Sequence, residues 1–171
     1  VSTLKTTILQ IKELEEDQTV GYSRRGVLTR RSRIAAIPIG YADGLNRHLG
    51  NRKGAVVVNG KRAPIVGNIC MDVCMIDVTD IDCKEGDRVE IFGEQLPVTE
   101  IAEWLQTIPY EILTSVSSRV KRVYYREYIF ASYYVVNRFS DICLVILIGI
   151  IFIFFENQDA ETVGMHCQVY S

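Results

Sequence analysis

Histidines and closely spaced cysteine pairs, from which zinc sites are usually built, are scarce in this sequence of 171 residues. Its two histidines, His48 and His166, lie far apart in the chain, and its five cysteines include no Cys-x-x-Cys pair. Zinc sites need such side chains at short spacing, so we expect no metal site. The odd number of cysteines and the lack of a secretory signal favour a reducing cytoplasm.

Motifs of several large enzyme classes are missing as well. The sequence has no glycine-rich phosphate-binding loop, no Ser–His–Asp set and no helical His–Glu metal motif. Its net charge of −2 argues against a nucleic acid as partner. Basic residues do cluster at Arg24, Arg25, Arg30, Arg31 and Arg33, but a solvated strand face accounts for them as well as a binding site does.

The composition changes abruptly after Glu127, where charged residues and turns give way to an apolar tail. Ile142 to Phe155 is an unbroken apolar run of 14 residues. As a helix it would be about 21 Å long, against a hydrocarbon core of about 30 Å in a membrane. We therefore divide the chain into a domain at 1–127 and an atypical hydrophobic tail at 128–171. The tail could be a weak or interfacial membrane anchor, a buried strand or helix, or a segment that is no selected part of the domain.

Short segments of strand character recur about every ten residues up to Glu127. Strands are expected at 4–14, 19–28, 33–39, 55–58, 61–66, 69–78, 88–92 and 119–125. Asn59-Gly60 joins two of them and provides the positive φ angles of a type I′ hairpin turn. Thr99 is expected to cap a short helix at 100–106, and Pro109 to begin a second one. This pattern predicts a mainly β barrel or sandwich with two short helices.

Four segments in a fixed order carry a specific resemblance. They are Val20-Gly21-Tyr22, the run Ile37-Pro38-Ile39-Gly40-Tyr41-Ala42-Asp43-Gly44, the run Ala63-Pro64-Ile65-Val66-Gly67-Asn68-Ile69-Cys70-Met71-Asp72, and Thr107-Ile108-Pro109-Tyr110-Glu111-Ile112 followed by Arg119-Val120. Together they resemble the C-terminal β-domain of alanine racemases, over about the first 126 residues. The segments at 24–26 and 116–124 also resemble a subgroup that is fused to a cell-wall peptide ligase.

This resemblance implies an enzyme that interconverts L- and D-alanine for peptidoglycan synthesis in the cytoplasm. In that family an N-terminal (β/α)₈ barrel, absent from these residues, holds pyridoxal phosphate on a lysine. The C-terminal β-domain of one subunit completes the active site of the other in a head-to-tail homodimer. No cofactor-binding residue can be assigned in this sequence.

The resemblance also implies roles for three residues. Racemisation needs one proton-transfer group on each face of a planar carbanion, which the pyridoxal ring stabilises as an electron sink. The barrel lysine serves one face, and Tyr22 matches the family's catalytic tyrosine on the other. Tyr41 matches a tyrosine that narrows the access of the substrate, and Met71 matches a position whose backbone N–H helps to bind the substrate carboxylate.

Several positions near these motifs bear on the site. A phenol has a pKa of about 10, so a tyrosine base needs help from positive charge or hydrogen bonds. On a strand, Arg24 would share a face with Tyr22. Ser23 stands where the family often has glycine. Ser118 stands where some members place a tyrosine near the cofactor phosphate. Asn68 stands where some members have an arginine at the substrate entry, so the entry has one positive charge fewer.

Three hypotheses follow. The first is the C-terminal part of an alanine racemase, which supplies the tyrosine base to a partner subunit and is inactive by itself. The second is a non-catalytic or truncated β-domain with a membrane-associating tail. The third is a gene fragment with a foreign tail, in which case deletion of the residues after Glu127 would improve solubility.

Overall fold

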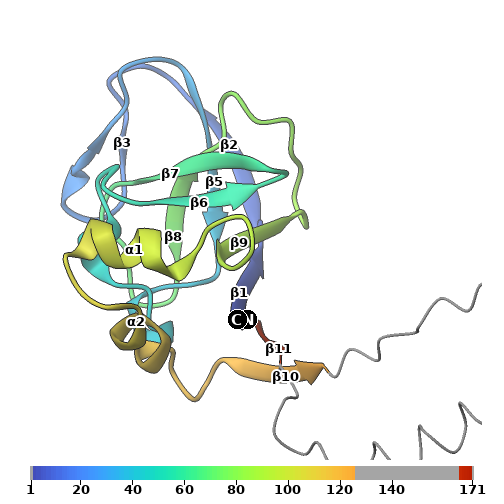
Figure 1. Ribbon diagram of the computed structural model, residues 1–171. Coiled ribbons are helices and arrows are strands. Elements are labelled where there is room, and N and C mark those ends of the chain that lie inside the picture. Colours follow the sequence, from blue (N-terminus) through green and yellow to red (C-terminus); the bar gives the residue numbers. More distant parts are fainter. Residues whose placement is uncertain (1, 126–165, 171) are drawn as a thin grey trace, which may run out of the picture. The chain divides into compact units, whose positions relative to one another are not determined.

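A computed structural model of the protein describes residues 2–125 and 166–170. The apolar run at 142–155 lies outside these residues, so the hypotheses on the tail and the division at 127 remain predictions. The described residues are mainly β, as predicted, and curl into a half-barrel with two short helices at one end (Figure 1).

One large sheet has the strand order β10-β11-β1-β9-β6-β7-β8-β5-β2. Its strands are β1 (Ser2–Thr7), β2 (Gln10–Leu14), β5 (Ser32–Ile37), β6 (Ala55–Val58), β7 (Lys61–Val66), β8 (Cys74–Asp77), β9 (Arg88–Phe92), β10 (Lys121–Tyr125) and β11 (His166–Tyr170). All neighbouring pairs are antiparallel except β1 and β11. Among the described residues, β3 (Thr19–Val20) and β4 (Gly26–Val27) form a second, two-stranded sheet.

The hairpin of β6 and β7 forms as the sequence predicts. Val58 pairs with Lys61, and the two residues between them have positive φ angles, 47° at Asn59 and 77° at Gly60. Glycine adopts such an angle without a steric cost, and asparagine tolerates it better than most residues.

The predicted strand at 4–14 is divided into β1 and β2, which pair with different neighbours. β1 pairs with β9 and β11, whereas β2 pairs with β5. Between them, Ile8 donates its N–H to the Asp87 carbonyl at 3.0 Å and Leu9 donates to the Ala36 carbonyl at 2.9 Å. The chain thus crosses from one part of the sheet to another at these two residues, which the imperfect alternation of the sequence did not show.

The predicted strand at 69–78 is mostly a loop. Only β8 is extended, and the residues before it leave the sheet to form a turn in which Cys70 donates its N–H to the Val73 carbonyl at 3.0 Å. Apolar composition alone cannot separate these two conformations, because Ile69 is buried in the loop as fully as Ile76 is in the strand.

Both predicted helices are present, as α1 (Val98–Leu105) and α2 (Pro109–Ser115). The expected cap on α1 was wrong, because Pro97 occupies the N-cap and Thr99 lies inside the helix. Pro109 does begin α2, where its missing N–H costs no hydrogen bond. No helix in the described part of the chain is long and apolar enough to cross a membrane.

The core lies between the curled sheet and α1 and α2. Ile37, Ile65 and Ile76 from three adjacent strands are at most 1% exposed, and Ile101 and Ala102 of α1 pack into the same cluster. Burial of one such large aliphatic side chain stabilises the fold by about 1.5–3 kcal/mol.

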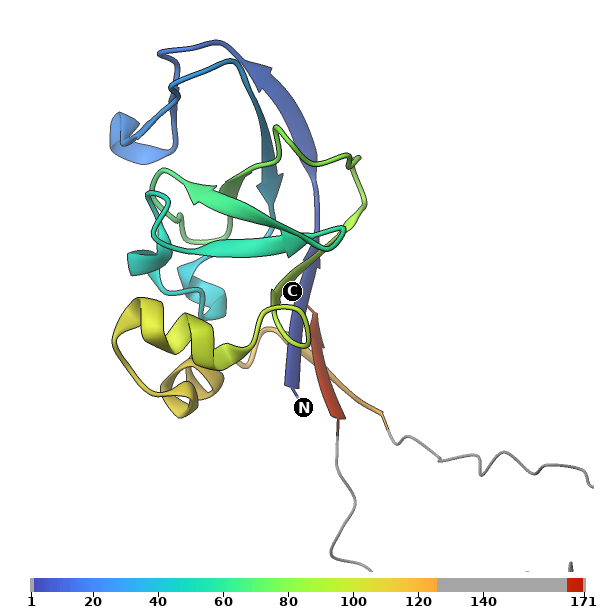
Figure 2. The ribbon, with the colours of Figure 1, turned by 45° about the horizontal axis from the view of Figure 1, so that its top comes forward.

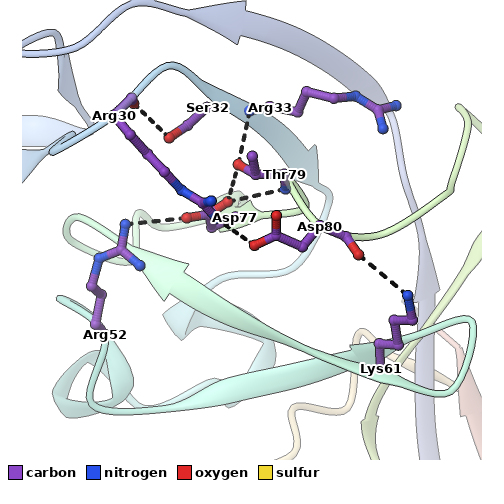
Figure 3. Close-up of polar contacts among 8 residues, drawn as sticks. All are labelled: Arg30, Ser32, Arg33, Arg52, Lys61, Asp77, Thr79 and Asp80. Atoms are coloured by element: carbon purple, nitrogen blue, oxygen red, sulfur yellow. Dashed lines mark hydrogen bonds and ion pairs between the residues drawn. The ribbon is translucent and has the colours of Figure 1, made fainter.

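Asp77 organises a polar network at the end of β8 (Figure 3). One carboxylate oxygen accepts from the Thr79 backbone N–H at 3.1 Å and from the Thr79 hydroxyl at 2.5 Å, and the other accepts from Arg52 at 3.2 Å. Burial opposes ionisation of this group, but the hydrogen bonds from Thr79 and Arg52 outweigh it and hold the pKa of Asp77 below its usual range. Nearby, Arg30 forms an ion pair with Asp80.

Candidate active site

A cleft of about 430 Å³ opens between three loops that leave the sheet. It is lined by Tyr22, Tyr41, Arg47, Asn68, Ile69, Cys70, Met71, Asp72 and Val73. The short turns η1 (Tyr22–Arg24), η2 (Tyr41–Asp43) and η3 (Arg47–Leu49) lie on the same side of the sheet in both views (Figures 1 and 2). The three residues singled out in the sequence, Tyr22, Tyr41 and Met71, therefore meet at one place.

Tyr22 stands on a tight turn and not on the strand that the sequence predicted. Gly21, Ser23 and Arg24 all have positive φ angles, of 79°, 61° and 50°. The expectation that Arg24 shares a strand face with Tyr22 is therefore wrong, and its guanidinium instead donates to the Thr19 hydroxyl at 3.3 Å. The turn leaves the Tyr22 side chain 74% exposed at the edge of the cleft.

Asn68 holds this turn against the neighbouring loop. Its side-chain amide donates to the Tyr22 carbonyl at 3.1 Å, and its own side-chain oxygen accepts from Asn51 at 3.0 Å. Gly21 also lies against the Asn68 backbone, since a Cβ there would be 3.4 Å from the Asn68 nitrogen. Two amides and one glycine thus fix the backbone of the exposed tyrosine.

Tyr41 lies on a turn that packs directly against the loop of Met71. The Tyr41 N–H donates to the Cys70 carbonyl and the Ala42 N–H to the Met71 carbonyl, both at 3.0 Å. Only glycine fits at position 40, because a Cβ there would lie 2.2 Å from the Met71 oxygen. These contacts set the separation of the two loops.

A cation lies over the Tyr41 ring. The Arg47 guanidinium carbon is 5.7 Å from the ring centroid, within the range of a cation–π interaction. Asn46 accepts the His48 N–H at 2.9 Å, which fixes the start of η3 and hence the place of Arg47. The cleft therefore has a positive charge beside Tyr41, and Asp72 adds a carboxylate to the same lining.

Met71 is half exposed in the cleft. Within the described part of the chain its carbonyl accepts a hydrogen bond, whereas its N–H donates to no other group. An unpaired backbone donor on the wall of a cleft is available to a ligand.

The comparisons with known proteins agree on one family. The sequence profile of "Alanine racemase, C-terminal domain" matches residues 1–124. This chain belongs to the alanine racemase C-terminal domain family. It is 49% identical over 132 residues to alanine racemase 2 of Caldanaerobacter subterraneus subsp. tengcongensis, which covers 74% of this chain and 34% of that protein. It is 46% identical over 127 residues to an alanine racemase of Clostridium perfringens, covering 71% of this chain and 33% of the relative.

Solved structures give the same result. The alanine racemase of Bartonella henselae with covalently bound pyridoxal phosphate aligns with a TM-score of 0.64 and 42% identity, over 67% of this chain and 32% of that one. The alanine racemase of Clostridium difficile in complex with cycloserine aligns with a TM-score of 0.63 and 40% identity, over 67% of this chain and 31% of that one. The chain thus spans about a third of the length of the racemases that it matches.

The described residues outside the cleft form no metal-binding cluster, and Cys74 among them is a buried thiol. No group of three or more His, Cys, Asp or Glu residues among those described could hold a metal ion. Burial raises the pKa of the Cys74 thiol, with a smaller contribution from Cys70, so Cys74 is poorly suited to act as a nucleophile.

Sequence reasoning missed two residues of the cleft in this racemase domain. Arg47 carries no motif signal of its own and lies in the cleft because η3 places it over the Tyr41 ring. The sequence indicates for Asn68 only the loss of a positive charge, whereas the structure gives its side chain a hydrogen bond to the Tyr22 carbonyl. Ser118, considered for the cofactor phosphate, is exposed and does not line the cleft.

Proposed function

We propose that residues 1–127 form the C-terminal domain of a pyridoxal-phosphate-dependent alanine racemase and supply the tyrosine base, Tyr22, to the partner subunit. The observation that carries the proposal is the convergence of Tyr22, Tyr41 and Met71 on one cleft. The family of the chain and the names of its relatives support the reaction and its substrates, L- and D-alanine.

Tyr22 transfers a proton to or from the α-carbon of alanine. Its side chain is 74% exposed, and its hydroxyl makes no hydrogen bond with any other residue that the structure describes. The phenolic oxygen is therefore free to approach a substrate held by another subunit. A positioned acid–base group of this kind contributes roughly 10²- to 10⁴-fold to the rate.

Two other groups orient the substrate. The unpaired N–H of Met71 binds the alanine carboxylate, because a backbone donor has a fixed direction and no side-chain entropy to lose. The Tyr41 ring, held by the turn beside Met71 and by Arg47, narrows the access to the cleft. The N–H of Met71 thus favours a substrate with a carboxylate, and the Tyr41 ring favours a small one.

The described residues do not by themselves form a site for pyridoxal phosphate. None of the residues that line the cleft is a lysine, and Ser118, at the position where some members of the family place a tyrosine near the cofactor phosphate, lies outside the cleft. We assign the cofactor, which acts as the electron sink for the α-carbon, to the barrel of a racemase subunit. A head-to-tail homodimer brings that barrel to the cleft, and the D-alanine product serves peptidoglycan synthesis in the cytoplasm.

A fused enzyme tests this proposal. The full 171-residue chain is joined to the N-terminal part of the Caldanaerobacter alanine racemase 2, in place of the region that it matches. We expect the fusion to racemise alanine and Tyr22→Phe to lower kcat by at least about 100-fold.

Tyr124→Phe is the matched control, because Tyr124 is also exposed, at 64%, and does not line the cleft. It should leave kcat unchanged. A folded fusion without racemase activity, or one whose activity survives in Tyr22→Phe, would contradict the proposal.

A further inference from the structure

Arg119 joins the two loops that face the cleft. Its Nε donates to Asp43 at 2.7 Å, and its Nη2 donates to Asp72. Asp43 ends the turn that carries Tyr41, and Asp72 follows Met71 directly in sequence. A single guanidinium thus connects the two substrate-facing loops, although Arg119 itself does not line the cleft.

Asp43 is buried, and both of its carboxylate oxygens accept hydrogen bonds. The side chain of Asp43 is 7% exposed, and its second carboxylate oxygen accepts the Gly40 N–H at 2.9 Å. A buried carboxylate is costly unless it is paired and hydrogen-bonded, so Arg119 is needed for this turn to keep its shape. The contact to Asp72, whose side chain is 60% exposed, can be removed without leaving a buried carboxylate unpaired.

The segment that carries Arg119 is itself attached to the Tyr41 turn. Ser117 donates its N–H to the Asp43 carbonyl at 3.0 Å, and the Ser115 hydroxyl donates to the Gly44 carbonyl at 3.2 Å. Gly44 packs so closely against this segment that a Cβ on it would lie 2.4 Å from the backbone carbonyl oxygen of Ser115. Arg119 therefore projects from a fixed base, and its planar fork reaches both carboxylates from different nitrogens.

We infer that Arg119 is a positioning residue that holds the Met71 loop against the Tyr41 turn and so sets the place of the substrate carboxylate. The second half of this inference rests on the proposed function, whereas the first half concerns the loops alone. The two hydrogen bonds that cross between the loops, from Tyr41 to Cys70 and from Ala42 to Met71, report directly on it.

The deciding experiment is amide hydrogen exchange, followed by NMR on the full chain. In Asp72→Asn, which removes one charge and leaves no buried carboxylate unpaired, the Tyr41 and Ala42 amides should exchange about 5- to 10-fold faster. Arg119→Lys should do the same, since a point charge cannot bridge both carboxylates. Amides of β6 provide the internal reference.

Arg62→Gln is the matched control, because it removes an arginine whose ion pair with Glu100 lies away from the cleft. It should leave the Tyr41 and Ala42 exchange rates unchanged. Unchanged rates in Asp72→Asn and Arg119→Lys would mean that Arg119 does not hold the two loops together. An equal acceleration of the β6 amides would mean that its role is a general structural one. Either result would overturn the inference.

A kinetic measurement then separates the inference from the proposed function. In the fused racemase, Arg119→Lys should raise KM for alanine about 5- to 10-fold with kcat within about twofold, as expected when uniform substrate binding is lost. A normal KM would overturn the link to the carboxylate. An inactive wild-type fusion would contradict the proposed function and leave the exchange result to decide the contact between the loops.

Discussion

Ile76 and Met71 lie five residues apart in the sequence, yet they belong to two regions held together in different ways. Ile76 is fully buried in β8, inside a cluster of aliphatic side chains from adjacent strands. Met71 is 50% exposed, on a loop fixed by backbone hydrogen bonds, a close glycine and the carboxylates that Arg119 joins. The comparison teaches that stability of this domain comes from the sheet, whereas the geometry of the cleft comes from a few directional contacts.

The largest effect on stability is expected from the sheet. Ile76→Ala should lower the free energy of unfolding by about 2–5 kcal/mol, because it removes buried methyl groups and leaves a cavity. Met71→Ala should change the same quantity by less than about 0.5 kcal/mol, as for other exposed positions. Urea denaturation of the two variants measures this difference directly. Similar losses in both would show that the two regions are not distinct.

Gly40→Ala tests the contact between the turn of Tyr41 and the loop of Met71. The added Cβ would meet the Met71 carbonyl, so the loop of Met71 must move and the unfolding free energy should fall by about 1–3 kcal/mol. Faster exchange of the Tyr41 and Ala42 amides should accompany this loss.

Gly86→Ala serves as its control, since no heavy atom lies within 4 Å of a Cβ there. Its φ of 87° costs about 1 kcal/mol by itself, without a change at the cleft. The loop contact would be refuted if both glycine variants left the Tyr41 and Ala42 amides equally protected.

Asp77→Asn tests the polar network at the edge of the sheet. Loss of the charged acceptor should cost about 1–2 kcal/mol at pH 7. Because the pKa of Asp77 is lowered by folding, its stabilisation is present above the unfolded-state pKa of about 4 and is lost as the pH falls through the lower folded value. The wild type should thus lose more stability between pH 5 and pH 2 than the variant does. Parallel pH profiles would contradict this assignment.

The smallest effect on stability is expected from Asn68→Asp. This substitution keeps the size of the side chain but removes the N–H donor to the Tyr22 carbonyl, which should cost less than about 1 kcal/mol. In the fused racemase kcat should nevertheless fall about 10-fold, because the turn that carries the base is less well fixed. A normal kcat would mean that the Tyr22 turn does not depend on Asn68.

The sequence predicted the sheet better than the cleft, for a physical reason. The β6–β7 hairpin and the start of α2 follow from local chemistry, namely the φ preferences of Asn59-Gly60 and the missing N–H of Pro109. The break between β1 and β2 could not be predicted, because it depends on which distant strand accepts each segment.

The cleft was predicted only through the family motifs. Those motifs predicted that Tyr22, Tyr41 and Met71 belong to one site. The motif sequences did not indicate the positive φ angles around Tyr22 or the position of Arg47. The place of Arg47 depends on the short turn η3 that Asn46 caps, and the Tyr22 turn depends on contacts between residues more than twenty positions apart, such as Asn68 with Tyr22. Periodicity and propensity do not record contacts of that kind.

The most direct test of the central claim is exchange of the alanine α-proton in deuterated water, measured separately for the two enantiomers with the fused racemase. Two proton-transfer groups on opposite faces predict that Tyr22→Phe abolishes exchange from one enantiomer, preserves exchange from the other and stops inversion. Equal exchange from both enantiomers in Tyr22→Phe, with inversion intact, would contradict the role of Tyr22 as the base that this domain contributes.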